Sequence, residues 1–263
     1  MPHHLTCSIV ESLAVITLSN PPQNRLTEQM IGELDSAITA IAHNGARAVL
    51  VNADGDNFSY GGDISPWPDM DAPELRALFE RYMAVFNSFE RLPTPVIAAV
   101  QGLCLGGGFE LILRSDVVFA TPSTYFGHPE KTLGLVTLLG GIYRVAERVG
   151  RNKAIEWALT GERLPASVMA DAGIVNHIVD EGNLVDVATE FARAAASGPT
   201  RAHAAHKALL RAWALGGVAT ADQTIFDIAM PLFDTADTRS ILPASVHALA
   251  NGQARPDGPF TGR

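Results

Sequence analysis

The stretch GLCLGGGFE, residues 102–110, joins an apolar strand-like segment, PVIAAV at 95–100, to an apolar helix start at 111–113. Three consecutive glycines at such a junction let the backbone approach another group closely. The first N–H groups of the helix stay free to bind an anion or a developing oxyanion. A tight turn followed by Glu110, a carboxylate favoured by the helix dipole, is the plainer interpretation. The spacing differs from the dinucleotide-binding and phosphate-loop glycine patterns.

The segments before this junction predict a layered α/β core. Residues 13–18 are β-prone, and Thr27 is a suitable N-cap for a helix whose apolar face runs from Met30 to Ile41. A buried strand at 48–52 completes a strand–helix–strand unit. The polar, glycine-rich loop 53–64 follows this strand, at the edge of a sheet where α/β proteins tend to place ligands.

After the junction the pattern becomes increasingly helical. Before the junction we expect a helix at 74–91, and after it we expect strands at 116–120 and 174–179 and helices at 143–149, 153–159 and 165–172. From about Leu184 the pattern is nearly all helical, with breaks at Gly198-Pro199 and Gly216-Gly217. We therefore divide the chain into a core, residues 1–195, and a C-terminal helical part, residues 196–263.

Composition indicates a soluble globular enzyme and disfavours two kinds of partner. The chain has 263 residues, 47% of them hydrophobic, and a formal net charge of −9, so binding to nucleic acid or to an anionic membrane is not expected as a main role. Cys7 and Cys104 are far apart and give no metal or redox spacing. Neither a signal peptide nor a membrane-spanning run is recognisable, so we expect a cytoplasmic protein.

Several motifs occur along the chain in a characteristic order. They are Asn24–Thr27, Phe58–Ile64, Pro95–Gly102, Gly106–Leu111, Phe126–Glu130, Leu133–Leu135 with Gly140-Gly141, Leu159–Glu162 and Ala172–Asn176. With these motifs the chain resembles the crotonase superfamily, that is, the enoyl-CoA hydratase/isomerase family. The resemblance runs from about Leu13 to Val179 and continues more weakly to Arg263.

The resemblance implies a fold, an assembly and a substrate class. The family has a spiral of ββα turns and a C-terminal helical part that forms trimers, which often pair as hexamers. Its substrates are acyl-CoA thioesters, so coenzyme A is a substrate carrier, and no cofactor or metal is expected. By resemblance, the N–H groups of Gly62 and Gly107 form an oxyanion hole, in which one donor contributes roughly 2.7–4 kcal/mol to the transition state.

Glu110 and Glu130 match the two carboxylates of the family's hydratases. Adding water to a conjugated double bond requires one group that deprotonates water and one that delivers a proton to the α-carbon. Because many isomerases keep only one of the pair, hydration of a 2-enoyl-CoA is the favoured reaction. Double-bond isomerisation, hydrolysis or retro-Claisen cleavage of a β-dicarbonyl compound, and a non-catalytic binding protein remain alternatives.

The same resemblance indicates a substrate-binding set. His128 stands where the family often has glutamine, and it either tunes the site or hydrogen-bonds nearby backbone. Asp63 and Asp116 fit structural roles in turns, and Trp67 fits either an acyl pocket or an ordinary core position. The expected substrate-binding residues are Tyr60, Gly61, Asp63, Ile64, Trp67, Gly106, His128 and Leu138.

Departures from the family pattern concern the CoA handle, by which we mean the basic residues that hold the CoA phosphates, and the acyl pocket. Gln23 and Ser65 stand where the family often has bases that contact CoA phosphates. The usual small residue and proline of the pocket are replaced by Tyr60 and Thr137. The bases that could substitute for the missing ones are Arg25, Lys131, Lys207 and Arg211.

Overall fold

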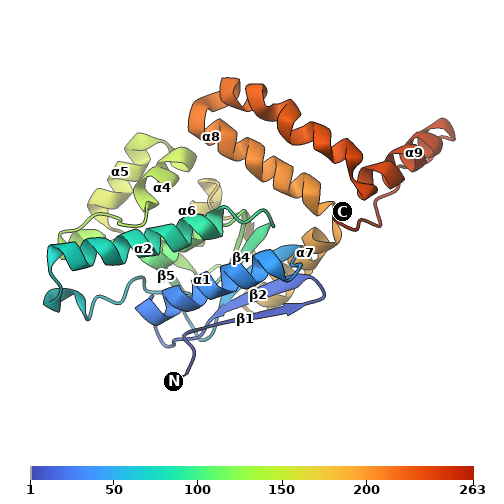
Figure 1. The fold of residues 1–263 in the computed structure, drawn as a ribbon. Helices are drawn as coiled ribbons and strands as arrows, with labels where there is room; N and C mark the ends of the chain where they lie inside the picture. Colours follow the sequence, from blue (N-terminus) through green and yellow to red (C-terminus); the bar gives the residue numbers. More distant parts are fainter. Residues whose placement is uncertain (1) are drawn as a thin grey trace.

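The computed structural model describes residues 2–263, in which two β-sheets form the centre of the molecule (Figure 1). The larger sheet has six strands in the order β1-β2-β3-β4-β6-β9 and is parallel except for the β1–β2 hairpin. Its strands are β1 (Leu5–Val10), β2 (Leu13–Leu18), β3 (Ala48–Ala53), β4 (Val96–Val100), β6 (Val117–Ala120) and β9 (His177–Ile178). The smaller sheet pairs β5 (Leu103–Leu105) with β7 (Tyr125–Gly127) and β8 (Leu164–Pro165).

Alternation along the central strands divides the core between the two faces of the larger sheet. Val49 and Val51 of β3 face α1 (Glu28–His43) and α2 (Ala72–Glu90), which run side by side in Figure 1. Ala48 and Leu50 of the same strand face the opposite helix, α7 (Leu184–Ser197). Both faces of the sheet are therefore covered by helices, which explains the nearly continuous apolar sequence of β3 and β4.

Local capping explains where the two covering helices begin. The Thr27 hydroxyl accepts a hydrogen bond from Met30 N at 3.2 Å, as the sequence predicted for α1. Asp71 and Glu74 form a reciprocal capping box at the start of α2, each side chain accepting from the other residue's N–H. The 3₁₀ turn Trp67–Asp69 precedes this box.

Two successive ββα turns position the segment with the three glycines. In the first, β4 joins the larger sheet, β5 joins the smaller sheet, and α3 (Gly107–Ile112) follows. In the second, β6 and β7 divide in the same way and lead into the 3₁₀ turn Pro129–Leu133. The expected spiral of ββα turns is thus present. The remaining core helices are α4 (Gly141–Val149), α5 (Arg151–Thr160) and α6 (Ala166–Asp171).

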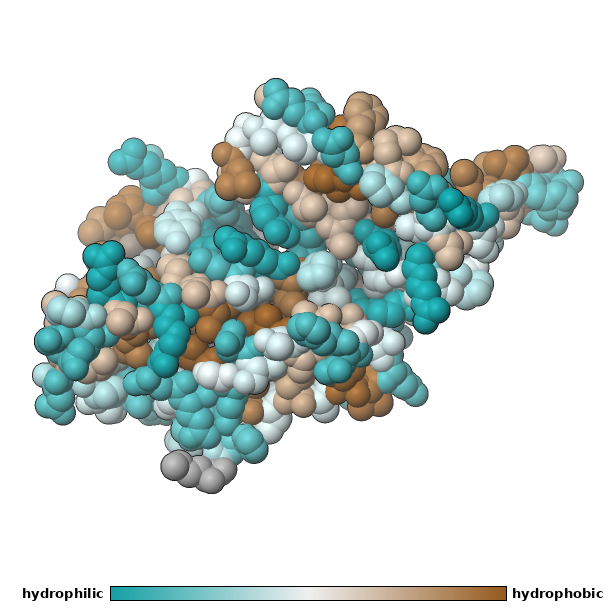
Figure 2. All heavy atoms as spheres, viewed as in Figure 1, coloured by the Kyte–Doolittle hydropathy of each residue, from teal (hydrophilic) through white to brown (hydrophobic). Residues whose placement is uncertain are grey.

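The C-terminal helices project from the core. Helix α8 (Thr200–Ala229) bends at Gly216 and Gly217, and the turn Met230–Asp234 leads to α9 (Ala236–Ala250). The C-terminal tail then folds back onto the start of α9. There the Asp237 carboxylate accepts hydrogen bonds from the N–H groups of Thr261 and Gly262. We call α8, the turn and α9, residues 200–250, the C-terminal arm. Apolar residues remain exposed along it (Figure 2).

Most sequence-predicted boundaries agree with the structure to within about two residues, with one clear exception. The strand expected at 174–179 is reduced to His177–Ile178. Ile174 and Val175 are buried, but their N–H groups bond to Met169 O of α6 rather than to a neighbouring strand. Within residues 2–263 no helix is long and apolar enough to cross a membrane.

Candidate active site

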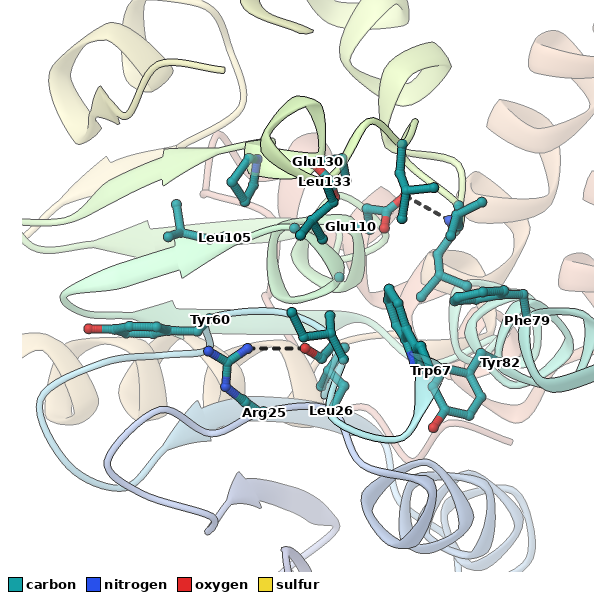
Figure 3. Close-up of a pocket in the computed structure, with 18 of the residues that line it drawn as sticks. Arg25, Leu26, Tyr60, Trp67, Phe79, Tyr82, Leu105, Glu110, Glu130 and Leu133 are labelled. Atoms are coloured by element: carbon teal, nitrogen blue, oxygen red, sulfur yellow. Dashed lines mark hydrogen bonds between the residues drawn. The ribbon is translucent and has the colours of Figure 1, made fainter. Parts of the chain in front are cut away.

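A cavity of about 250 Å³ opens between the glycine junction, α2 and the 3₁₀ turn after β7 (Figure 3). In Figure 3, Glu110 and Glu130 lie on one side of the space, and Arg25, Leu26 and Tyr60 lie on the opposite side. The other residues that line it are Gly62, Ile64, Trp67, Phe79, Tyr82, Leu105, Gly106, Gly107, Pro129, Thr132, Leu133, Leu135, Val136, Leu138 and Leu139.

Gly62 and Gly107 bring two backbone N–H groups together at this cavity. A Cβ at position 107 would lie 3.6 Å from Gly62 N. No hydrogen bond from either N–H is found within residues 2–263. Behind them, Gly61 has a φ of +92°, and a Cβ there would lie 2.9 Å from Leu105 O and 3.0 Å from Gly107 N. Only glycine at position 61 lets the two loops approach this closely.

Glu110 is held rigidly at the start of α3. Its side chain is buried, and Oε1 accepts hydrogen bonds from Leu139 N and Gly141 N, both at 2.8 Å. Burial raises the pKa of the Glu110 carboxyl above its ordinary value, although the two N–H donors and the charge of Arg114 oppose the rise. The two donors favour the ionised form and fix the direction in which the second oxygen points.

Arg114 supports this arrangement and was not recognised from the sequence. The buried guanidinium donates to Leu139 O at 2.6 Å and to Glu110 O at 2.8 Å. The loop at Leu139 is thus bonded on its N–H side by the Glu110 carboxylate and on its carbonyl side by Arg114. The sequence signal that could have revealed it is an arginine four residues after Glu110, in the turn that directly follows the short helix α3.

Glu130 lies in the first turn of the 3₁₀ segment after β7 and differs from Glu110 in its surroundings. A Cβ at Gly106 would lie 3.2 Å from Glu130 Oε1, so this oxygen is close to the glycine junction. Oε2 is buried without a hydrogen-bond partner within residues 2–263. Burial, with the nearby Glu110 charge, raises the pKa of the Glu130 carboxyl to about 7. The two carboxyls therefore share a site but differ in how strongly protein donors stabilise the ionised form.

An apolar wall completes the cavity. The Trp67 and Phe79 rings meet edge to face, with centroids 5.2 Å apart. Tyr82 packs beside Phe79, and burial raises the pKa of its phenol to about 12, so the ring remains neutral. Leu133 and Val136 line the cavity from the loop after the 3₁₀ turn. Phe79 and Tyr82 were not identified from the sequence because their spacing is that of ordinary core positions of a helix. Leu133 and Val136 were not identified because they lie at the end of the 3₁₀ turn and in the loop after it, where no periodicity marks a site.

Of the eight expected substrate-binding residues, Tyr60, Ile64, Trp67, Gly106 and Leu138 line the cavity. The other three do not. Gly61 packs behind Gly107. The Asp63 carboxylate accepts from Ser65 N at 3.1 Å and from its hydroxyl at 2.7 Å, which fits the structural alternative. His128 lies beyond Glu130 and lines a second cavity.

The four bases considered as contacts for the CoA phosphates line three different pockets. Among the residues described, Arg25 is the basic side chain that lines the cavity, and it donates to Gln23 Oε1 at 2.6 Å and to Gly62 O at 3.2 Å. Lys207 instead pairs with Asp116 at 2.6 Å, because α8 passes that end of the sheet. Arg211 lies with it in a separate cleft against α4, and Lys131 lines the second cavity. Lys207 and Arg211 are therefore wrong candidates for this cavity within one chain.

The structure contains no evident metal centre in residues 2–263, since no group of three or more His, Cys, Asp or Glu side chains is arranged to hold an ion. Cys104 is fully buried in the core, and burial raises the pKa of its thiol well above the ordinary value. The chemical groups that line the cavity include two carboxyls, two backbone donors, the Arg25 guanidinium and an apolar wall.

Known proteins resemble the chain over most of its length. The enoyl-CoA hydratase/isomerase family profile matches residues 8–239. A mevalonyl-coenzyme A hydratase of Beauveria bassiana is 34% identical over 211 residues, 76% of this chain and 75% of that protein. An enoyl-CoA hydratase structure from Bacillus anthracis superimposes with a TM-score of 0.88 at 25% identity, covering 99% of this chain and 100% of the other. One from Geobacillus kaustophilus gives 0.89 at 28% identity, covering 99% and 98%. The chain belongs to the enoyl-CoA hydratase/isomerase family.

Proposed function

We propose that this protein adds water to a 2-enoyl-CoA thioester and forms a 3-hydroxyacyl-CoA. The observation that carries the proposal is the placement of Glu110 and Glu130 on one cavity beside the unengaged N–H groups of Gly62 and Gly107. Hydration needs a base for water, an acid for the α-carbon and donors for a developing enolate oxygen. These four groups can supply all three requirements.

The backbone donors act on the thioester oxygen. In the proposed complex this oxygen accepts from Gly62 N–H and Gly107 N–H, and the bonds strengthen as negative charge develops during attack on C3. Fixed donors need no reorganisation as the charge forms, which is why they stabilise the transition state more than the ground state. Gly107 is the first residue of α3, so its N–H also contributes the positive end of the first helical turn.

The two carboxyls divide the proton transfers. Glu110, whose ionised form is stabilised by two N–H donors, takes a proton from water while the water oxygen bonds to C3. Glu130, whose pKa lies near 7, enters the cycle protonated and gives its proton to C2 as the enolate collapses. After the product forms, Glu110 holds a proton and Glu130 is ionised. One proton must therefore pass back, through solvent water, before the next turnover.

The experiment is incubation of the protein with crotonyl-CoA while the absorbance of the conjugated enoyl thioester is followed. Loss of absorbance at a rate proportional to enzyme concentration supports hydration, and chromatography should identify 3-hydroxybutyryl-CoA. Glu190→Gln is a matched control for the glutamate variants described below, because Glu190 is exposed on α7 and remote from the cavity.

Double-bond isomerisation is the second candidate, and one observation favours it. A carboxyl with a pKa of about 7 can both remove and return a proton at neutral pH, so Glu130 alone could move a proton along an acyl chain. A 3-enoyl-CoA substrate separates the two reactions. Conversion of 3-enoyl-CoA to 2-enoyl-CoA without formation of a hydroxy product would replace hydration by isomerisation.

A further inference from the structure

His128 is a buried histidine without a hydrogen-bond partner. It lies between β7 and the 3₁₀ turn that carries Glu130, and 6% of the residue is exposed. Neither Nδ1 nor Nε2 makes a hydrogen bond within residues 2–263, and the same holds for Glu130 Oε2. Leaving a polar group unpaired in the interior costs about 1–3 kcal/mol, so unpaired groups that lie close together need an explanation.

The packing around the ring leaves one direction open. Phe109 covers one face, with ring centroids 4.8 Å apart. The Cε1–Nε2 edge abuts Gly141, where a Cβ would lie 2.4 Å from Cε1, 2.8 Å from Nε2 and 3.0 Å from Glu110 Cγ. Nδ1 points toward Glu130 and lies 3.8 Å from its Oε2. The imidazole thus sits between the two glutamates, with its free nitrogen directed at the less strongly held one.

A second cavity, of about 280 Å³, lies on the His128 side of Glu130. Its polar lining consists of His128, Glu130, Lys131 and Thr137, and its other walls are apolar. Glu130 lines both cavities. Since Oε1 lies by Gly106 and Oε2 lies by His128, the two oxygens of this carboxyl have separate environments.

The charge state of the imidazole follows from its burial. Burial lowers the pKa of His128 to about 4, so the ring is neutral in the range where the enzyme is expected to work and carries one N–H. The titratable groups nearby are Glu130 on the 3₁₀ turn, Glu110 on α3 and Lys131 at the second cavity. A neutral ring facing a carboxyl can offer an N–H without adding a charge.

We propose that His128 is a positioning residue for Glu130, whose Nδ1–H donates to Oε2 and so keeps Oε1 directed at the substrate's α-carbon. This inference rests on the proposed hydratase function. The two atoms must approach by about 0.9 Å to reach ordinary hydrogen-bond distance. Catalytic hydrogen bonds are often long in a free enzyme and shorten in the substrate complex. The proton that Glu130 transfers is then carried by the oxygen that faces the front cavity.

The hydrogen bond has a measurable consequence for Glu130. A donor to Oε2 stabilises the carboxylate more than the acid, so its loss raises the pKa of Glu130. In His128→Leu we expect kcat to fall about 10- to 100-fold, KM to change less than about twofold, and the alkaline limb of the kcat–pH profile to move to higher pH. In His128→Gln, whose amide retains an N–H donor, both kcat and the limb should return most of the way toward the wild type.

The control is His177→Leu, because His177 also stacks on a phenylalanine, Phe119, at 4.6 Å, but lies on β9 away from the glutamates. It should leave the pH profile unchanged. An unmoved limb in His128→Leu, or equal profiles for the Leu and Gln variants, would reduce His128 to a space-filling residue. A limb that moves to lower pH would show that His128 accepts a hydrogen bond from protonated Glu130, which overturns the proposed direction.

A measurement that does not require turnover separates this inference from the proposed function. Carbon-13 NMR of labelled glutamate carboxyls can follow the titration of Glu130, assigned by its loss in Glu130→Gln. Its pKa should be higher in His128→Leu than in the wild type and in His128→Gln. If crotonyl-CoA is not hydrated but this order is observed, the hydrogen bond stands and the reaction assignment fails. If hydration is observed without this order, the positioning role fails alone.

Discussion

Helices α7 and α8 follow each other in the chain, are both rich in alanine, and have opposite relations to the core. Helix α7 buries Leu184, Ala188, Ala192 and Ala196 against the larger sheet, at the four-residue spacing of one helix face. Helix α8 has twice the length but contains no buried residue. Trp213, Leu215 and Phe226 are instead 50%, 82% and 71% exposed.

The difference shows which apolar residues one chain buries by itself and which it leaves exposed to solvent. The candidate site lies in the core. There, polar side chains such as Glu110 and Arg114 bond to other parts of the same chain. Many large apolar residues of α8 and α9 instead stay exposed, and exposed apolar areas of this kind mark interaction surfaces. We therefore predict that the exposed apolar residues of α8 and α9 contact further copies of the chain, while the candidate site lies in the core.

The largest effect is expected from the two carboxyls of the core. Glu110→Gln and Glu130→Gln should each lower kcat for crotonyl-CoA by about 10²–10⁴-fold, the range typical of acid–base groups. Both changes preserve shape and remove the ability to exchange a proton. Steady-state kinetics beside the Glu190→Gln control provide the measurement. Near-normal turnover in either variant would exclude the paired role.

Gly61→Ala should lower kcat by about 10- to 10³-fold, a loss on the scale of one oxyanion donor. The added Cβ would lie 2.9 Å from Leu105 O and 3.0 Å from Gly107 N, so the two loops must separate. Gly45→Ala is the matched control, because Gly45 also has positive φ but has no heavy atom within 4 Å of its added Cβ. If both variants lose the same activity, backbone strain rather than crowding at the site is responsible.

The arm should control assembly. We expect the protein to form a homotrimer, or a pair of trimers, with α8 and α9 in the contacts, and Trp213→Glu with Phe226→Glu to shift it toward the monomer. Light scattering at micromolar concentration measures the mass, and thermal unfolding monitors the fold. A wild-type monomer would contradict the prediction. Variants that stay assembled would place the contacts elsewhere.

The sequence predicted the fold well because the deciding signals are local. The glycines at 106–108, the β-prone segments and the Thr27 cap depend on neighbouring residues, and the family resemblance indicated their order. Placement of Glu110 and Glu130 on one cavity also agrees with expectation. These agreements concern position, and the catalytic roles stay predictions.

Contacts between distant segments could not be predicted in the same way. Nothing local shows that Arg114 bonds to Leu139 O, or that Lys207 is engaged by Asp116, 91 residues away. Its motif put His128 in the expected substrate-binding set, with tuning of the site or a backbone hydrogen bond as its roles. The path of the chain after β7 places the ring beside Glu130 and the second cavity. Contacts between distant segments therefore decided the positions that sequence reasoning could not place.

Burial of Glu130 should make the stability of the core depend on pH. The pKa of Glu130 in the folded protein, about 7, is above the ordinary value of 4.5, so folding favours its protonated form. The stabilisation of the folded protein that results is fully present below pH 4.5 and is lost as pH rises through 7. Glu130→Gln mimics the protonated form. Relative to the wild type, its free energy of unfolding should therefore increase between pH 5 and pH 8, by at most about 3 kcal/mol.

Denaturant titrations of both proteins at the two pH values measure this difference. The lowered pKa of His128 has the opposite effect, since it destabilises the folded protein as pH falls below 6.5. Its cause is burial, which both proteins share, so this burial contribution cancels in the comparison. A difference that stays constant with pH would mean that Glu130 ionises as it does in water.

The smallest effect is expected for CoA affinity. Here too the core and the arm differ, because each offers one candidate arginine. Arg25 lies at the cavity, while Arg211 lies on α8 in a separate cleft. Calorimetry should therefore find weak CoA binding that decreases further at high salt. A charge-assisted contact is worth about 1.5–3 kcal/mol, so Arg25→Gln should weaken binding about 10-fold or more at low salt and reduce the salt dependence. Arg211→Gln should change neither the affinity nor its salt dependence if the CoA handle lies within one chain.

A different outcome would place the base on a neighbouring copy. In that case Arg211→Gln lowers the affinity of the assembled protein, but has no effect when it is added to a monomeric Trp213→Glu/Phe226→Glu variant. Tight binding that is insensitive to salt would contradict both versions, because it would require phosphate contacts that depend little on charged side chains.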